Sequence, residues 1–326
     1  VAYGMLLSKG LIRVGIGIPA GAEFTLVAVD DPYQFASAAQ LSLFRRPLPS
    51  TNLPFLSTVM WDGREASLGS QAIDATLGHA QATGTRQSQM DAIVAFESSI
   101  FTAQVDGDKA GRLDFSGGNG GPSILSDTTF YVGINDPIGK NPTGAPFDPN
   151  AFTLYDAWRD HPGNGAPGRA RSAIYRGQQL FNTLPISISN VAGLNDVLGV
   201  PTLQGTCTTC HDTPNVGDHS VAMPLNIGIS DAGRRTPDMP LYTLRNTATG
   251  ATVQTTDPGK ALITGKWADI GKFKGPILRG VGLRAPYFHN GSQATLDDVV
   301  DFYDARFALG LTSQQHDDLV AFLEAL

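Results

Sequence analysis

The chain has 326 residues, of which 41% are hydrophobic and only 16% charged, and its formal net charge is −7. Enough apolar surface is available for a core, which excludes a mainly disordered chain. Mild acidity without a Lys/Arg run argues against nucleic acid or an anionic membrane as partner. The most apolar stretch, residues 11–29, contains Arg13, Pro19 and Glu23, so no membrane span is expected. The sequence predicts a soluble globular protein from which any export signal has been removed.

The first half of the chain gives few regular patterns. Residues 1–60 are mixed in character and rich in proline, whereas residues 90–104 have the spacing of an amphipathic helix. Residues 106–149 follow as a long stretch rich in glycine and proline, with the run GGNGG at 117–121. A stretch of this kind predicts a surface insertion or linker.

The second half predicts three helices. Residues 170–182 read as a helix in which Gly177 allows a neighbouring element to approach closely. Thr295 has the features of an N-cap, since acidic residues follow it and apolar residues recur at helical spacing. The last predicted helix covers residues 313–326.

Both cysteines lie in one motif, Cys207-Thr208-Thr209-Cys210-His211. This C-x-x-C-H pattern is typical of covalent c-type haem attachment, in which two thiols bind the vinyl groups and the next imidazole binds the iron. A zinc site would need further ligands, and a thioredoxin-like site would need an α/β context. A structural disulfide is the remaining alternative. The motif predicts a haem c protein outside the bacterial cytoplasm, in the periplasm.

Several segments around the motif resemble the bacterial dihaem cytochrome c peroxidase and MauG superfamily. The first is W-D-G-R at 61–64, followed by Ser67-Leu68 and Gln71-Ala72. The others are F-K-G-P-I-L-R at 273–279, A-P-Y-F-H-N-G-S at 285–292 and Thr295-Leu296. The resemblance implies a mainly α protein with two cytochrome c-like helical domains, residues 1–160 and 161–326, and long Gly/Pro-rich loops. Each domain of that family carries one haem, and a tryptophan lies between the haems.

Carried over to this chain, the resemblance assigns roles to three residues. His211 is the proximal ligand of the second haem, and Trp61 is the relay between the haems. Tyr303 matches the other axial ligand, which is typically Met in the peroxidases and Tyr in MauG-like members. A packing role for Tyr303 on an apolar helix face is the alternative.

Two departures from the family pattern bear on function. Residues 1–78 contain no Cys and no His, so the chain supplies no attachment site for a first haem. Either the sequence begins after that site, or the protein is a one-haem relative. Where the peroxidases commonly have a distal Glu, this chain has Gln81, which cannot shuttle a proton as a carboxylate does. His79 could replace it as the acid/base group, or could be an exposed loop residue.

The remaining candidates concern charge and metal. Arg279, together with Arg284 and Lys274, is suited to neutralise haem propionates, although a solvated cationic patch is the alternative. The family usually holds calcium between its domains, and Asn52 and the carbonyl of Pro276 fall near the matching segments. His219 is expected in a surface loop, or less favourably near the haem edge.

Together these patterns predict an exported haem oxidoreductase of the peroxidase type. Hydrogen peroxide is the expected oxidant, and a small redox protein or a quinol-linked donor supplies electrons. A pure electron-transfer cytochrome and a haem-bearing docking subunit of a larger complex remain as alternatives. The sequence leaves open the oligomeric state, a homodimer or a larger redox complex included.

Overall fold

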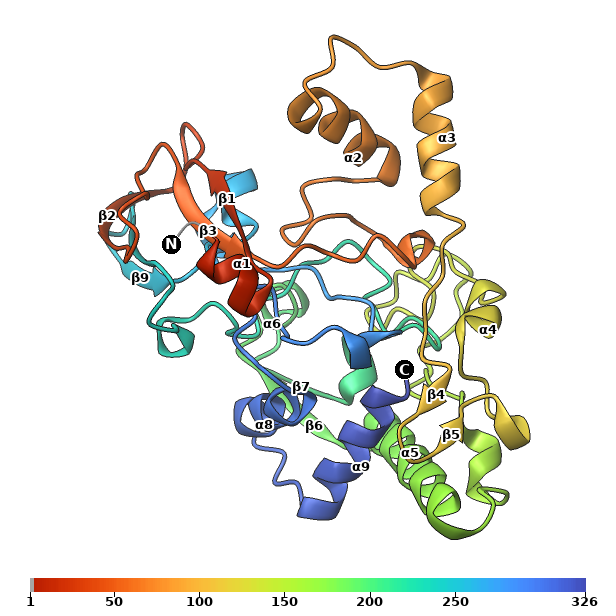
Figure 1. Cartoon of the computed structure of the whole chain (residues 1–326). Coiled ribbons are helices and arrows are strands. Elements are labelled where there is room, and N and C mark those ends of the chain that lie inside the picture. The colour runs from red at the N-terminus through yellow and green to blue at the C-terminus, as the bar shows by residue number, and fades with distance from the viewer. Residues whose placement is uncertain (1–2) are drawn as a thin grey trace.

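The computed structural model describes residues 3–326, and Figure 1 shows them arranged as a β-rich lobe, a helical arm and a larger body. The β-rich lobe consists of residues 4–45 and 241–270, and therefore joins the start of the chain to a segment about 200 residues later. The helical arm is residues 68–97, and the body contains the C-terminus. The proposed division of the chain at residue 160 stays a prediction.

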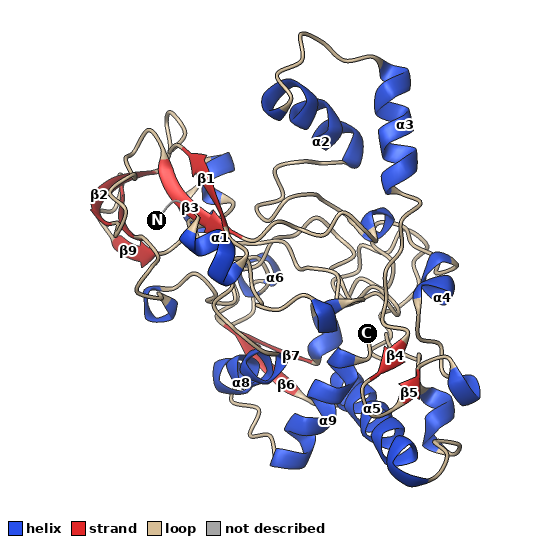
Figure 2. Ribbon diagram, viewed as in Figure 1, coloured by secondary structure: helices blue, strands red, loops and turns tan. Residues whose placement is uncertain are grey.

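The expectation of a mainly α protein is wrong. Helices make up only 33% of the chain and strands 16%, and several small sheets are present (Figure 2). The strands are short, and the partners of one sheet are far apart in sequence. No local helical or alternating pattern can reveal such pairing, because the apolar residues of each strand find their core only when the distant segments meet.

The β-rich lobe is built from two sheets. Its elements are α1 (Gly4–Lys9), β1 (Ile12–Ile16), β2 (Phe24–Asp30), β3 (Leu41–Arg45), β8 (Leu241–Asn246), β9 (Thr252–Thr255) and α7 (Ala261–Thr264). One antiparallel sheet has the order β1-β3, and the other has the order β2-β8-β9. Tyr242 of β8 joins the two sheets, because its hydroxyl accepts a hydrogen bond from the Ser42 amide at 2.9 Å and donates one to the Ser42 carbonyl at 2.7 Å.

The helical arm contains α2 (Leu68–Asp74), a π-helical turn (Ala75–His79) and α3 (Gln87–Glu97). Ser67 caps α2 with its side chain, which accepts from the Ser70 amide at 3.1 Å. The predicted helix at 90–104 is present as α3, but it begins three residues earlier and ends at Glu97. Its C-terminal boundary coincides with Ser98-Ser99, where Ser99 Oγ donates to the Phe96 carbonyl and the chain turns away.

The body is held together by α5 (Gly165–Thr183), α8 (Leu296–Phe307) and α9 (Ser313–Glu324), which confirm the three helices predicted in the second half. The expected close approach at Gly177 is also confirmed, since a Cβ there would lie 1.9 Å from the Asp318 carbonyl oxygen of α9. Thr295 caps α8, because its hydroxyl accepts from the Asp298 amide at 3.2 Å. Aromatic side chains pack between α5 and α9: the ring centroids of Phe181 in α5 and Phe322 in α9 lie 5.6 Å apart.

Smaller elements surround these three helices. They are β4 (Asp106–Gly107), β5 (Gly111–Arg112), α4 (Pro122–Ser126), β6 (Ile186–Ser189), α6 (Asn195–Leu198) and β7 (Thr202–Gly205). The Gly/Pro-rich stretch 106–149 contains only β4, β5, α4 and a short 3-10 turn as regular structure. Strands β6 and β7 form an antiparallel pair, and the cysteine motif directly follows β7. No helix among the described residues is long and apolar enough to cross a membrane.

Candidate functional site

A large apolar cavity lies in the body next to the cysteine motif. Its empty space, including the solvent-filled mouth, is about 1850 Å³. Apolar side chains of α8, α9 and residues 273–289 make up most of its wall. The polar and reactive residues that line it include Arg46, Trp61, Cys207, Cys210, His211, His219, Lys274, Arg284, His289 and Tyr303. The cavity therefore brings together the residues that the sequence assigned to a haem c site with others that it did not.

The cysteine motif forms a single capped turn after β7. Thr206 caps the 3-10 turn Cys207–Thr209, and the Cys210 amide donates to the Cys207 carbonyl at 3.2 Å. Both thiols are free and line the cavity. Burial raises the pKa of Cys207 and of Cys210 to about 12, so both thiols are neutral at physiological pH. This arrangement leaves two thiols side by side on one wall, as covalent attachment requires.

The imidazole of His211 is held in one orientation. Its Nδ1 lies 2.6 Å from the carbonyl oxygen of Gly217. A carbonyl oxygen can only accept a hydrogen bond, so Nδ1 carries the proton and Nε2 keeps its lone pair. Burial lowers the pKa of His211, which favours this neutral form. A second hydrogen bond of this kind is the usual way in which a protein orients a metal-binding histidine.

Tyr303 lines the same cavity from α8. Its ring stacks on Phe307 at 6.2 Å and meets Phe302 edge to face at 5.3 Å. Burial, together with the nearby thiols of Cys207 and Cys210, raises the pKa of its hydroxyl. The phenol is therefore neutral in the protein alone. Tyr303 thus lines the same cavity as Cys207, Cys210 and His211, and its role as an axial ligand stays a prediction.

The charges on the cavity wall fit a group that carries carboxylates. Lys274 and Arg284 line the cavity, and neither is paired with a carboxylate within the described part of the chain. Burial lowers the pKa of Lys274 to about 8 and that of Arg284 to about 10. The buried carboxylate of Asp218 opposes this shift at Lys274, whereas no carboxylate opposes it at Arg284. A buried cation without a carboxylate partner is costly, so the cavity wall favours an anionic ligand. The apolar wall, the two thiols, His211 and these cations together fit haem c.

Trp61 and His289 lie beside one another on the wall. The indole Nε1 of Trp61 donates to the Arg46 carbonyl at 2.7 Å, and the ring meets the imidazole of His289 edge to face at 6.3 Å. The sequence analysis assigned no role to His289, although this residue lies in the A-P-Y-F-H-N-G-S segment at 285–292 that resembles the family. The signal was a histidine surrounded by apolar and turn residues, a pattern that does not by itself separate a buried imidazole from an exposed one.

His219 is not a surface residue. Its side chain is buried and lines the cavity, so the expectation of a surface loop is wrong. Its Nδ1 lies 3.2 Å from an oxygen of Asp212, and that carboxylate also accepts from the amide and the hydroxyl of Ser220. The polar residues next to His219 in the sequence suggested exposure. In the structure Ser220, one of these neighbours, is buried and donates hydrogen bonds to the Asp212 carboxylate.

The other candidates lie away from the cavity. His79 and Gln81 are exposed at the end of the helical arm and in the following turn. Arg279 is buried, but its guanidinium donates to the backbone carbonyls of Gly121 and Asn215 and does not line the cavity. Asn52 is buried as well. Its side-chain amide donates to the Thr102 carbonyl and accepts from the Thr102 amide, both at 2.8 Å. Their roles remain predictions.

The calcium assignment rests on backbone and amide oxygens alone. The amide of Asn52 also lies 3.5 Å from the Arg279 carbonyl, three residues beyond Pro276. No group of three or more His, Cys, Asp or Glu side chains suited to a metal ion occurs among residues 3–326. The calcium site stays a prediction.

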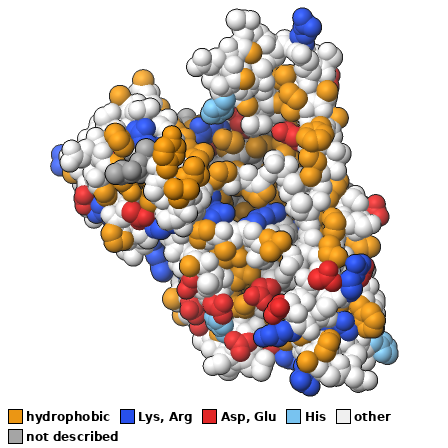
Figure 3. Space-filling model, in the orientation of Figure 1, with side chains coloured by type: hydrophobic (Ala, Val, Ile, Leu, Met, Phe, Trp, Pro, Cys, Tyr) orange, Lys and Arg blue, Asp and Glu red, His pale blue; other side chains and the backbone are white. Residues whose placement is uncertain are grey.

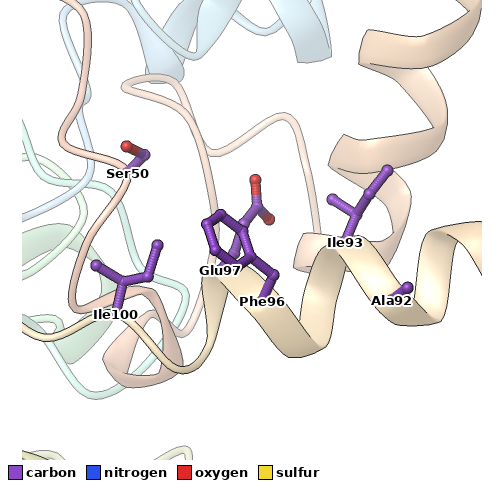
Figure 4. A pocket seen from close by; sticks show the side chains of 6 residues that line it. All are labelled: Ser50, Ala92, Ile93, Phe96, Glu97 and Ile100. Atoms are coloured by element: carbon purple, nitrogen blue, oxygen red, sulfur yellow. The ribbon is translucent and has the colours of Figure 1, made fainter.

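A second hollow lies beside α3 in the helical arm (Figure 4). It is lined by Ser50, Ala92, Ile93, Phe96, Glu97 and Ile100. Burial raises the pKa of Glu97, the one ionisable group among these lining residues. The hollow offers neither a thiol nor an imidazole, so it does not compete with the cavity as a haem site.

Comparison with known proteins identifies relatives. Over 137 residues the chain is 37% identical to cytochrome-c peroxidase IdrP2 of Denitromonas iodatirespirans, covering 38% of this chain and 36% of that protein. Over 232 residues it is 31% identical to cytochrome-c peroxidase IdrP1 of Pseudomonas sp. (strain SCT), covering 64% and 58%. A solved structure of a MauG-like protein associated with microbial copper homeostasis aligns with a TM-score of 0.48 and 20% identity, over 89% of this chain and 75% of that one. No family model matches.

The alignments are partial: the first two relatives are matched over about a third to three-fifths of their own length. They nevertheless agree with the resemblance that the sequence motifs carried, because both relatives are cytochrome c peroxidases. Over the matched parts, this chain is similar to cytochrome c peroxidases.

Proposed function

We propose that this chain is the haem-bearing part of an exported, peroxidase-type oxidoreductase, in which the His211 haem transfers electrons. The observation that carries this proposal is the hydrogen bond from His211 Nδ1 to the Gly217 carbonyl. It leaves Nε2 free as a ligand in a cavity that also contains the thiols of Cys207 and Cys210. The identity of the relatives as cytochrome c peroxidases supports the reaction class.

The residues of the cavity divide the work of holding the haem. Cys207 and Cys210 would attach it covalently, and His211 would bind the iron through Nε2. Lys274 and Arg284, two of the three cations that the sequence named for this role, would neutralise its carboxylates. When bound, the haem supplies reversible one-electron chemistry, and the protein tunes its potential through axial ligand and burial.

Tyr303 is proposed as the second axial ligand. Coordination by a phenolate favours ferric iron and lowers the potential relative to a methionine ligand. Its pKa is raised in the protein alone, so binding requires loss of the phenol proton. A haem with both His211 and Tyr303 in place has no position for peroxide. Peroxide would then react at a second redox centre, and Trp61 would relay electrons to it from the cavity wall.

The cellular setting follows from covalent haem attachment and is part of the proposal. The protein would act in the periplasm, receive electrons from a small redox protein or a quinol-linked donor, and reduce hydrogen peroxide. His79 and Gln81, exposed on the helical arm, would face the second redox centre. Whether calcium binds near Asn52 and Pro276 is a separate question that metal analysis of the purified protein answers.

A pure electron carrier is the second candidate, favoured by the presence of both His211 and Tyr303 at one cavity. A reoxidation experiment separates the two functions. The protein is purified from its own host with all of its redox centres, reduced, mixed with hydrogen peroxide, and followed by its visible spectrum. Peroxidase function predicts reoxidation that Trp61→Phe slows at least about 10-fold, while the control Trp267→Phe, in the β-rich lobe, leaves the rate unchanged. Absence of reoxidation in the native protein would support the electron carrier instead.

A further inference from the structure

The side chain of His289 is buried without a hydrogen-bond partner. It is fully inaccessible to solvent, and neither Nδ1 nor Nε2 has a partner among the described residues. The ring stacks on Phe273 at 4.1 Å with an interplanar angle of 25°, and it presents an edge contact to Trp61. A buried imidazole without a hydrogen-bond partner destabilises the fold, unless a bound ligand supplies that partner.

The nearest carboxylate does not complete it. Nε2 of His289 lies 3.8 Å from an oxygen of Asp257, which is beyond hydrogen-bond distance. Asp257 is already engaged, because its oxygens accept from Arg45 at 2.7 and 2.9 Å and from the Gly259 amide at 2.8 Å. The negative charge of Asp257 is therefore largely satisfied by Arg45.

No other described residue accepts a hydrogen bond from the ring. Burial lowers the pKa of His289 to about 4, so the imidazole is neutral and carries one N–H. No Asp or Glu is among the described residues that line the cavity, and Lys274, Arg284 and Arg46 are cations that only donate through their side chains. A carboxylate on the ligand is the acceptor that the cations of the cavity wall also favour.

We infer that His289 donates a hydrogen bond to a carboxylate of the bound haem, and so connects Trp61 to the haem edge. This inference rests on the proposed haem site and assigns a further positioning residue to it. The same chain segment fixes both rings, since the Arg46 amide donates to the His289 carbonyl at 2.7 Å while the Arg46 carbonyl accepts from the Trp61 indole. Trp61 and His289 are thereby placed against each other independently of their side-chain contact.

The test compares His289→Phe with His289→Gln in the haem-loaded protein. Phe keeps a flat ring against Phe273 but removes the N–H, whereas Gln keeps an N–H donor. Two readouts do not depend on turnover: the propionate bending band in the resonance Raman spectrum, and the midpoint potential. Loss of the hydrogen bond exposes the haem carboxylate charge, which stabilises ferric iron. His289→Phe is therefore expected to shift both the band and the potential downward, and His289→Gln to restore part of each shift.

The exposed His161→Phe serves as the matched control and should leave both readouts unchanged. Unchanged readouts in His289→Phe, with covalent haem present, would overturn the role of His289 and leave the haem site intact. Equal shifts in His289→Phe and His289→Gln would also overturn it, because a general packing defect does not distinguish a donor from its absence. If the native protein carries no covalent haem, the proposed function fails first, and this inference fails with it.

Discussion

The Nδ1 atom of His211 lies 2.6 Å from the carbonyl oxygen of Gly217, six residues further along the chain. This contact determines which nitrogen faces the cavity, and it depends on a turn that only glycine adopts without strain. Gly217 has a φ of +82°, and a Cβ at this position would lie 2.7 Å from the ring of Phe152. The orientation of the proposed iron ligand is thus built into the backbone next to the aromatic core of the body.

Gly217→Ala should disturb both stability and the haem site. Backbone strain costs about 1–3 kcal/mol at such a position, and the contact with Phe152 adds to it. Gly199→Ala is a matched control, since Gly199 has a φ of +66° with nothing within 4 Å of its Cβ position. Thermal denaturation and the visible spectrum are measured for both. Gly217→Ala should lose more stability and change its spectrum, whereas a spectrum identical to that of Gly199→Ala would contradict the proposed role of this turn.

Tyr303→Phe should open one coordination position of the haem. Because Phe cannot bind iron, we expect a change from a low-spin to a high-spin spectrum, while Tyr303→Met should remain low-spin and raise the midpoint potential. Tyr175→Phe, at a half-buried tyrosine of α5 outside the cavity, serves as the control. If Tyr303→Phe keeps the native spectrum and potential, Tyr303 has only a packing role.

Arg45→Met should destabilise the fold strongly. The guanidinium of Arg45 is buried between Asp62 and Asp257, with contacts of 2.6 to 2.9 Å. Its removal leaves two buried carboxylates short of a partner, and breaking such a pair costs about 3–5 kcal/mol. The exposed pair of Arg159 and Asp160 provides a control, because solvent screens this pair and Arg159→Met should leave the stability almost unchanged. Chemical denaturation measures both, and similar losses for the two variants would show that the buried cluster is not structurally important.

His289 should make the stability depend on pH below neutrality. Burial lowers its pKa from 6.5 to about 4, with Arg45 also lowering it and Asp257 opposing. The unfolded chain therefore binds a proton between pH 6.5 and 4 while the folded protein does not, so stability is complete above pH 6.5 and decreases as the pH falls to 4. The full effect is about 3 kcal/mol. Unfolding of the haem-free protein at pH 7 and pH 4 should show this difference relative to haem-free His289→Phe; parallel pH profiles of the two would refute it.

The parts of the molecule set by local pattern were predictable from the sequence. The helices α5, α8 and α9 follow from apolar periodicity, the capping by Thr295 from residue type, and the thiols and imidazole of the site from the spacing of Cys207, Cys210 and His211. Even the need for Gly177 could be inferred. In each case the residues that determine the feature lie within a few turns of one another.

The parts that depend on distant segments could not be predicted. The sheet β2-β8-β9 pairs Phe24 with Asn246, and the cluster around Arg45 joins residues more than 200 positions apart. His219 looks exposed by its sequence neighbours, and the residues around His289 do not distinguish an exposed from a buried side chain; both are buried in the folded protein. Figure 3 shows the surface that results, with hydrophobic side chains around the hollow between the β-rich lobe and the helical arm, and acidic side chains over α8 and α9.

The most direct test of the account is the intact mass and haem content of the protein produced in a host that matures c-type cytochromes, measured beside a Cys207→Ala/Cys210→Ala variant. The account predicts one covalent haem on this chain, localised by peptide mapping to Cys207–Cys210, and none on the variant. A native protein whose mass equals that of the bare chain, or a disulfide between these two cysteines, would contradict it.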